Sequence, residues 1–81
     1  MESPGPAPAK VEIFEGPTPL GNWQVVAVLN GKFYASSSCR MKSSAKNHVK
    51  QDLKDGGHTY PATSYRYDLL KEMHPNAISS K

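Results

Sequence analysis

The sequence predicts an α+β domain in which a three-stranded antiparallel sheet packs against a helix, with a second helix near the C-terminus. The dipeptide Asn30-Gly31 joins two runs rich in β-branched and aromatic residues, and Asn-Gly supplies both positive-φ positions of a two-residue hairpin turn. After this hairpin, apolar residues recur at four-residue steps over 41–53, which is the spacing of one face of a helix.

Length and composition restrict the class of protein. The chain has 81 residues, enough for one small domain, and its ten Lys and Arg outnumber its seven Asp and Glu. The net charge of +3 permits an anionic partner but does not require one. A single cysteine rules out an internal disulfide. We expect an intracellular protein, of the cytoplasm or the nucleus, that does not associate with a membrane.

The first part of the chain alternates between coil and strand. Residues 1–9 hold three of the seven prolines and are expected to form a disordered tail. The domain is then expected over 10–74, and 75–81 as a flexible C-terminus. Residues 10–14 alternate polar and apolar, which predicts a short strand, whereas the turn-forming residues of 15–22 predict a loop. Residues 23–29 form the first strand of the hairpin.

Strand alternation gives the hairpin two faces, and both carry apolar side chains. A two-residue turn places Ala27 opposite Tyr34. One face then holds Trp23, Val25, Ala27, Leu29 and Tyr34, and the other holds Gln24, Val26, Val28, Phe33 and Ala35. An exposed apolar face attracts a partner, so Val26, Val28 and Phe33 are candidates for binding a protein or a second copy of the chain. The alternative is that the N-terminal strand or the C-terminal tail covers them.

A helix is predicted from Arg40 to Lys54, where the following Asp-Gly-Gly provides a C-terminal stop. Its apolar stripe consists of Met41, Ala45, Val49 and Leu53, and a row of lysines at 42, 46, 50 and 54 runs beside it. Because four residues overshoot one turn by about 40°, only neighbouring lysines such as Lys42 and Lys46 share a direction. A second helix is predicted over 64–73, ended by His74-Pro75.

Residues 15–53 resemble the double-stranded-RNA-binding domain family (dsRBD). The resemblance lies in the order and spacing of four parts: Glu-Gly-Pro at 15–17, the strand aromatic Trp23, the Asn-Gly hairpin with Tyr34, and KSSAKN at 42–47, which opens the helix. It implies the family's plan of a helix, three antiparallel strands and a second helix. It also implies binding to duplex RNA.

The groove geometry of duplex RNA determines which of its groups a protein can contact. Its major groove is too narrow for side chains, so a protein contacts the 2′-hydroxyls of two minor grooves and the phosphates between them. A helix N-terminus attracts an anion through its unpaired N–H groups and its macrodipole. On the family's pattern, Lys42 and Lys46 match two of three phosphate-facing lysines. The expected RNA-binding residues are Arg40, Lys42 and Lys46, on phosphates, and Asn22, near a minor groove.

Three departures from the family's pattern favour an alternative function, a protein-interaction or dimerisation module that keeps the fold and no longer binds RNA. Ser43 replaces one of the adjacent lysines at the helix start, and Pro19 stands where the family's loop carries a histidine. The family's first helix should precede residue 10, where prolines forbid a helix. Either the C-terminal helix docks where the family's first helix would lie, which we favour, or it serves another role.

The sequence shows no catalytic or metal-binding motif. The histidines at 48, 58 and 74 and the single Cys39 lack the spacing of zinc ligands, and none of these histidines lies at a spacing typical of an activated cysteine nucleophile. The carboxylates form no recognisable acid and base pair. We therefore expect a binding protein, not an enzyme, with no cofactor or metal, whose partner is double-stranded RNA or another protein.

Overall fold

A computed structural model describes residues 10–75. The elements are, in chain order, β1 (Val11–Pro17), β2 (Trp23–Leu29), β3 (Lys32–Cys39), α1 (Lys42–Asp55), β4 (Tyr65–Arg66), the 3₁₀ helix η1 (Tyr67–Leu69) and α2 (Leu70–Met73). The α+β class is confirmed. The predictions of a disordered tail over 1–9 and a flexible end lie outside the described residues, apart from Pro75.

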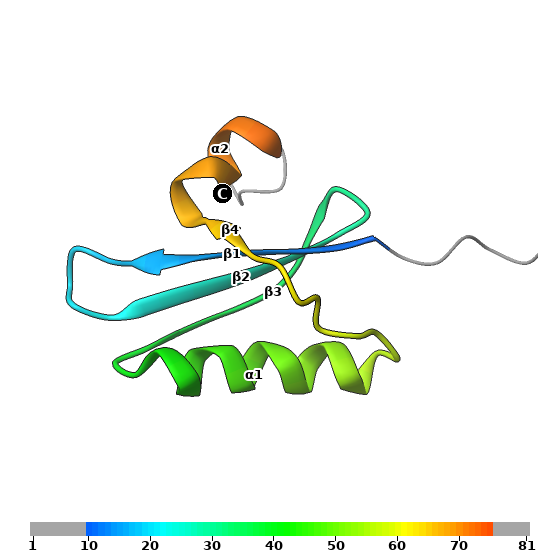
Figure 1. The fold of residues 1–81 in the computed structure, drawn as a ribbon, viewed down its shortest axis with the longest axis horizontal. Helices are drawn as coiled ribbons and strands as arrows, with labels where there is room; N and C mark the ends of the chain where they lie inside the picture. The colour runs from blue at the N-terminus through cyan, green and yellow to red at the C-terminus, as the bar shows by residue number, and fades with distance from the viewer. Residues whose placement is uncertain (1–9, 76–81) are drawn as a thin grey trace, which may run out of the picture.

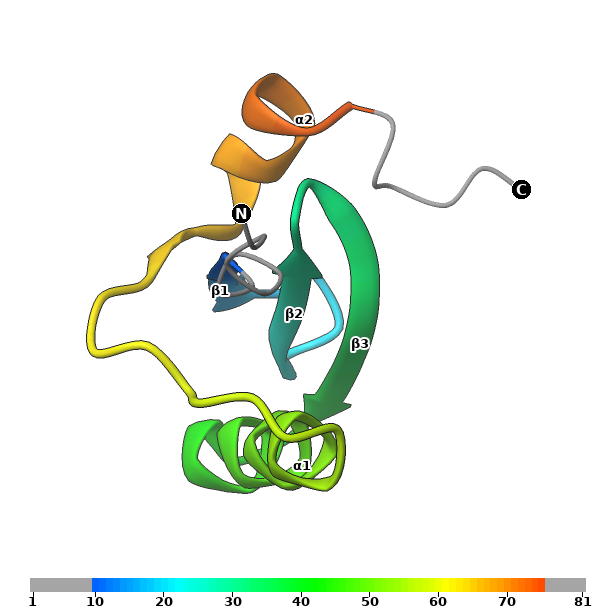
Figure 2. The same cartoon turned by 90° about the vertical axis from the view of Figure 1, so that its right-hand side faces the viewer.

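The four strands form one mixed sheet in the order β3-β2-β1-β4. β2 pairs antiparallel with both β1 and β3, as predicted, and β4 adds a short parallel pairing to the edge of β1. Figures 1 and 2 show three layers, with α1 on one face of the sheet and η1 and α2 on the other. β1 therefore runs through the interior, with strands on both sides and a helical segment on each face.

The hairpin between β2 and β3 forms at the predicted turn. Asn30 and Gly31 have φ angles of 53° and 82°, the left-handed conformation that a type I′ turn requires at both positions. Val28 pairs with Phe33, as a two-residue turn predicts. The turn chemistry of Asn-Gly is thus sufficient to set the first pairs of the register.

A β-bulge changes the register beyond those pairs. Ala27 pairs with Ala35 and not with Tyr34, so Tyr34 is the extra residue of β3. Both Tyr34 and Ala35 pack on the α1 side of the sheet. The prediction that Ala35 lies on the opposite face is therefore wrong, because strict alternation from the turn does not allow for an inserted residue.

β1 is longer than predicted. Glu15, Gly16 and Pro17 continue the strand and pair with β2, although their composition indicated a loop. Gly16 is buried, and a Cβ at this position would lie 3.1 Å from the Cβ of Tyr67. Glycine is therefore needed here for the close approach of η1 to the strand, and the turn itself is confined to the following Thr18–Asn22 segment.

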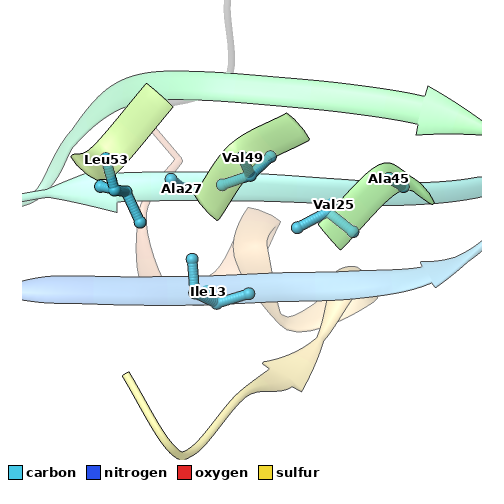
Figure 3. Packing of buried hydrophobic residues seen from close by; sticks show 6 residues of the cluster. All are labelled: Ile13, Val25, Ala27, Ala45, Val49 and Leu53. Carbon is cyan, nitrogen blue, oxygen red and sulfur yellow. The ribbon is translucent and has the colours of Figure 1, made fainter. Parts of the chain in front are cut away.

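The helix α1 packs against the sheet through the predicted stripe. Ala45, Val49 and Leu53 are fully buried. They contact Ile13 of β1 and Val25 and Ala27 of β2, as Figure 3 shows. Met41 is the N-cap of the helix and is 64% exposed, so it lies outside the stripe. The predicted stop is confirmed: Gly57 has a φ of 81°, and its N–H donates to the carbonyl of Lys54.

The other face of the sheet is covered by the chain's own C-terminal segment. Val26 and Val28 are buried in a cluster with Phe14 and Leu70. The free apolar face proposed as a partner site is thus closed within the monomer, which was the alternative considered. Of the three candidate residues only Phe33 remains accessible, at 49% exposure.

The C-terminal helix differs from its prediction in extent and in place. A helix was expected over 64–73, but α2 spans only Leu70–Met73 and follows β4 and η1. It lies on the face opposite α1 (Figure 2), so it does not occupy the place of the family's first helix, which would lie beside α1. On the α1 side, Tyr60 of the connecting segment packs against the core instead.

Three contacts attach the C-terminal segment to β1. The backbone of β4 pairs with Phe14 and Glu15. The ring of Phe14 stacks on that of Tyr65, with centroids 5.2 Å apart. Further along, Nε2 of His74 lies 2.7 Å from Oε1 of Glu12, whose side chain is buried. The segment is thus held by a strand pair, an aromatic pair and a polar contact at its end.

Removing the side chain of Leu70 tests this covering role. We expect Leu70→Ala to lower the free energy of unfolding by about 2–3 kcal/mol, because the leucine is buried over Phe14, Val26 and Val28. Urea unfolding at low temperature measures the change. Leu20→Ala is the control, since Leu20 is 88% exposed. Equal stabilities of the two variants would mean that the C-terminal segment does not cover the sheet.

Candidate nucleic-acid interface

The loop between β1 and β2 and the start of α1 lie at the same end of the domain (Figure 1). The sheet register explains this placement. Trp23, the first residue of β2, pairs with Cys39, the last residue of β3, and α1 begins three residues later. The predicted RNA-binding residue Asn22 and the predicted lysines of α1 are therefore brought to one end of the molecule.

The N-terminus of α1 has the features of an anion site. Within residues 10–75 no side chain caps this helix, and its first turn contains no acidic residue. The first-turn N–H groups of a helix have no acceptor inside the helix, so they and the positive end of the macrodipole are available to an external anion. Arg40 is exposed in the two-residue link that precedes the helix.

Lys42 and Lys46 line the same cavity at the start of α1. The Nζ of Lys42 lies 4.7 Å from the centre of the Trp23 ring, a cation–π contact that directs this side chain toward the sheet. The positive charges of both lysines also lower the pKa of the Glu15 carboxyl. Neither lysine forms a direct ion pair with Glu15 among the contacts of the described residues, so both ammonium groups keep capacity for a further anion.

Glu15 is a site residue that sequence reasoning missed. It lies on β1 facing α1, and its Oε1 accepts a hydrogen bond of 2.9 Å from Nε1 of Trp23. Burial acts to raise the pKa of the Glu15 carboxyl, but hydrogen bonds from Ser64 and Trp23 and the charges of Lys46 and Lys42 outweigh it and lower the pKa. The carboxylate is therefore ionised at neutral pH and reduces the positive potential of the two lysines.

The loop before β2 is closed by its own hydrogen bonds. The N–H of Asn22 donates to Oγ1 of Thr18 at 3.1 Å, and its carbonyl accepts from the N–H of Thr18 at 2.8 Å. The backbone of Asn22 is thus used within the turn, and its side chain is the part left for a ligand. Pro19 and Leu20 form the exposed tip of this loop.

Two cavities adjoin this end of the sheet and share Glu15, Trp23 and Arg66 in their walls. The smaller one, of about 280 Å³, is the cavity of Lys42 and Lys46 and also contacts Ser64 and Tyr65. The larger one, of about 490 Å³, has a mostly apolar lining that includes Gly16, Pro17, Tyr67 and Asp68. Sequence reasoning missed Arg66, because only the pairing of β4 with β1 brings it here.

A second cluster of polar side chains lies at the end of β3. The Nδ1 of His48 is 2.9 Å from Oγ of Ser37 and 3.5 Å from Sγ of Cys39. Spacing along the chain did not reveal this cysteine and histidine pair, since it forms across the packing of β3 on α1. Within residues 10–75 no group of three or more His, Cys, Asp and Glu side chains is placed to hold a metal ion.

Comparison of the chain with protein-family models, with curated proteins and with solved structures found no match. The resemblance to the dsRBD family therefore stays a prediction from the residues and spacings described above. None of the helices within residues 10–75 is long and apolar enough to cross a membrane.

The lowered pKa of Glu15 predicts an acid transition at this site. Ionised Glu15 stabilises the fold above the pKa that it has in the unfolded chain, and this contribution is lost as the pH falls through its lower folded-state pKa. Trp23 is the only tryptophan, so its fluorescence in the folded protein should change with a midpoint below the usual pKa of a glutamic acid. We expect Glu15→Gln to abolish this change.

Glu72→Gln provides a matched control, because Glu72 is exposed on α2. This variant should retain the transition. A change of fluorescence that persists unaltered in Glu15→Gln would show that another group causes it.

Proposed function

We propose that this protein binds double-stranded RNA by shape, with the N-terminus of α1 on the phosphate backbone and the loop between β1 and β2 near a minor groove. The observation that supports this best is the pair of Lys42 and Lys46 in one cavity at a helix start without a side-chain cap. The buried stripe of α1 fixes the orientation of that helix end on the sheet. The proposed activity is binding without catalysis, cofactor or metal.

The contacts follow from the chemistry of each element. Amide groups of the first turn and the charges of Arg40, Lys42 and Lys46 attract phosphate oxygens. The side chain of Asn22 has donors and an acceptor for a ribose 2′-hydroxyl, which is present in RNA and absent from DNA. Because these groups read backbone and sugar, binding should show little dependence on base sequence, as the resemblance to the family also implies.

The placement of the C-terminal segment limits the affinity. α2 lies on the face opposite α1, so within residues 10–75 no helix beside α1 supplies the second minor-groove contact expected of the family. About three phosphate contacts remain. They correspond to a slope of roughly −2 to −3 for log K against log salt concentration, which is shallow for a nucleic-acid-binding protein. Glu15 weakens the positive potential further.

The alternative function, protein interaction or dimerisation through the outer sheet face, loses most of the surface on which it was based. Val26 and Val28 lie beneath Leu70, and a partner could reach them only after the C-terminal segment has moved. Phe33 alone is a small apolar contact. RNA binding is therefore the function that the geometry supports better.

Replacing the two lysines tests the proposal. At about 0.1 M salt, Lys42→Gln/Lys46→Gln should weaken binding to a 20-base-pair RNA duplex by roughly 10- to 100-fold and should make the salt slope shallower by about 2. Fluorescence anisotropy of labelled RNA measures both quantities. A DNA duplex of the same sequence should bind more weakly than RNA to the unmodified protein.

The matched control is Lys50→Gln/Lys54→Gln, which makes the same change of charge at the same spacing on the same helix. This double variant should lose much less affinity. Equal losses in the two pairs would show that only net charge matters, and equal affinity for RNA and DNA in all proteins would contradict recognition of duplex RNA.

A further inference from the structure

We infer that the two adjoining cavities beside Trp23 form a binding site for a single unpaired nucleotide, with the base in the larger cavity and the phosphate in the smaller one. This inference goes beyond the proposed function, with which it shares only the two lysines. A duplex held on its phosphates leaves the larger cavity unused, because a paired base is not free to enter it.

The two cavities match the two parts of a nucleotide. The larger one, of about 490 Å³, lies within the size range of small-molecule sites and has a mostly apolar lining that includes Trp23, Pro17 and Tyr67. The smaller one has Lys42 and Lys46 in its wall. The shared residues Glu15, Trp23 and Arg66 form the region between them, where the sugar would lie.

Charge determines which way the ligand is oriented. The larger cavity is lined by two carboxylates, those of Glu15 and Asp68, against the single guanidinium of Arg66, so a phosphate is disfavoured there. Both lysines line the smaller cavity, where their charges exceed that of the single Glu15 carboxylate. The phosphate therefore belongs at the lysines and the uncharged base between the apolar walls. The carboxylates of Glu15 and Asp68 are acceptors for sugar hydroxyls or for N–H groups of a base.

Trp23 is held in place in the walls of both cavities. Its Nε1 donates to Glu15, which fixes the edge of the ring, and the Nζ of Lys42 lies over one face of the ring, 4.7 Å from its centre. A base would stack on this face only by displacing the Lys42 ammonium group toward the phosphate. Stacking on an aromatic ring tolerates any base, because every base has a π face. Arg66, paired with Asp68 at 3.1 Å, presents a planar guanidinium group in the same walls, and such groups also stack on bases.

An unpaired nucleotide is the ligand that these features fit. A base pair in a duplex is stacked above and below, whereas a base in a loop, a bulge or a strand end can be turned out into a pocket. A phosphate without a base would leave the apolar cavity empty. A free nucleoside monophosphate is the smallest molecule that has both parts, which makes it the proper probe.

Titration with adenosine 5′-monophosphate tests the inference, read out by Trp23 fluorescence and by the NMR signal of its indole N–H. Adenosine and ribose 5-phosphate serve as probes that lack the phosphate or the base. We expect the complete nucleotide to bind about tenfold tighter than either and to perturb the indole. Equal binding of the nucleotide and ribose 5-phosphate, or an unperturbed indole at saturation, would overturn the inference.

Two variants of the same helix assign the phosphate end. Lys46→Gln should weaken binding of the nucleotide about tenfold and leave that of adenosine unchanged, whereas Lys54→Gln, which makes the same change of charge away from the cavity, should alter neither. Both lysines are solvent-accessible, and circular dichroism verifies that the variants are folded. Equal effects of the two substitutions would contradict a phosphate position beside Lys46.

The outcome is distinguishable from a failure of the proposed function. If the RNA duplex binds and the nucleotide does not, the nucleotide site is contradicted and the proposed function is not. If the nucleotide binds at Trp23 and the duplex does not, the nucleotide site is supported and the proposed recognition of double-stranded RNA is contradicted.

Discussion

Burial of β1 on both faces is the constraint on which the rest of the structure depends. Ile13 points to α1 and Phe14 to the C-terminal segment, and both are fully buried. A strand with apolar side chains on both faces needs a covering layer on each side. Within residues 10–75, α1 is the one long helix, and the cover of the other face comes from the C-terminal segment, which places α2 there.

The route of the chain between the two layers creates the candidate site. After α1 the chain crosses the open edge of β1, where β4 pairs with Phe14 and Glu15 before η1 turns onto the far face. This crossing places Ser64 and Arg66 beside the start of α1. The cationic helix end and the apolar cavity next to it are thus products of the same crossing, and Gly16 permits it by leaving room for Tyr67.

Glu15 connects the stability of this region with its binding properties. The carboxylate accepts a hydrogen bond from Trp23 and interacts with both lysines, so it orders the site when no ligand is bound. The same negative charge opposes an incoming phosphate. An arrangement of this kind favours a ligand that brings more than a phosphate, because contacts with the base and sugar offset that repulsion.

Local chemistry allowed much of the fold to be predicted. Asn30-Gly31 specified its turn, the four-residue spacing specified the buried face of α1, and Gly56-Gly57 specified its end, because each of these signals acts within a few residues along the chain. The shared direction of Lys42 and Lys46 follows from helix geometry alone.

The other features depend on contacts between distant residues: the bulge at Tyr34, the continuation of β1 through Pro17, the pairing of β4, and the choice of sheet face by Leu70. Glu15 and Arg66 entered the site in the same way, since only tertiary packing brings a strand residue and a C-terminal residue to the start of a helix. The sequence by itself determined the turn, the buried helical face and the lysine pair, whereas the tertiary structure decided which face each layer covers and what surrounds the lysines.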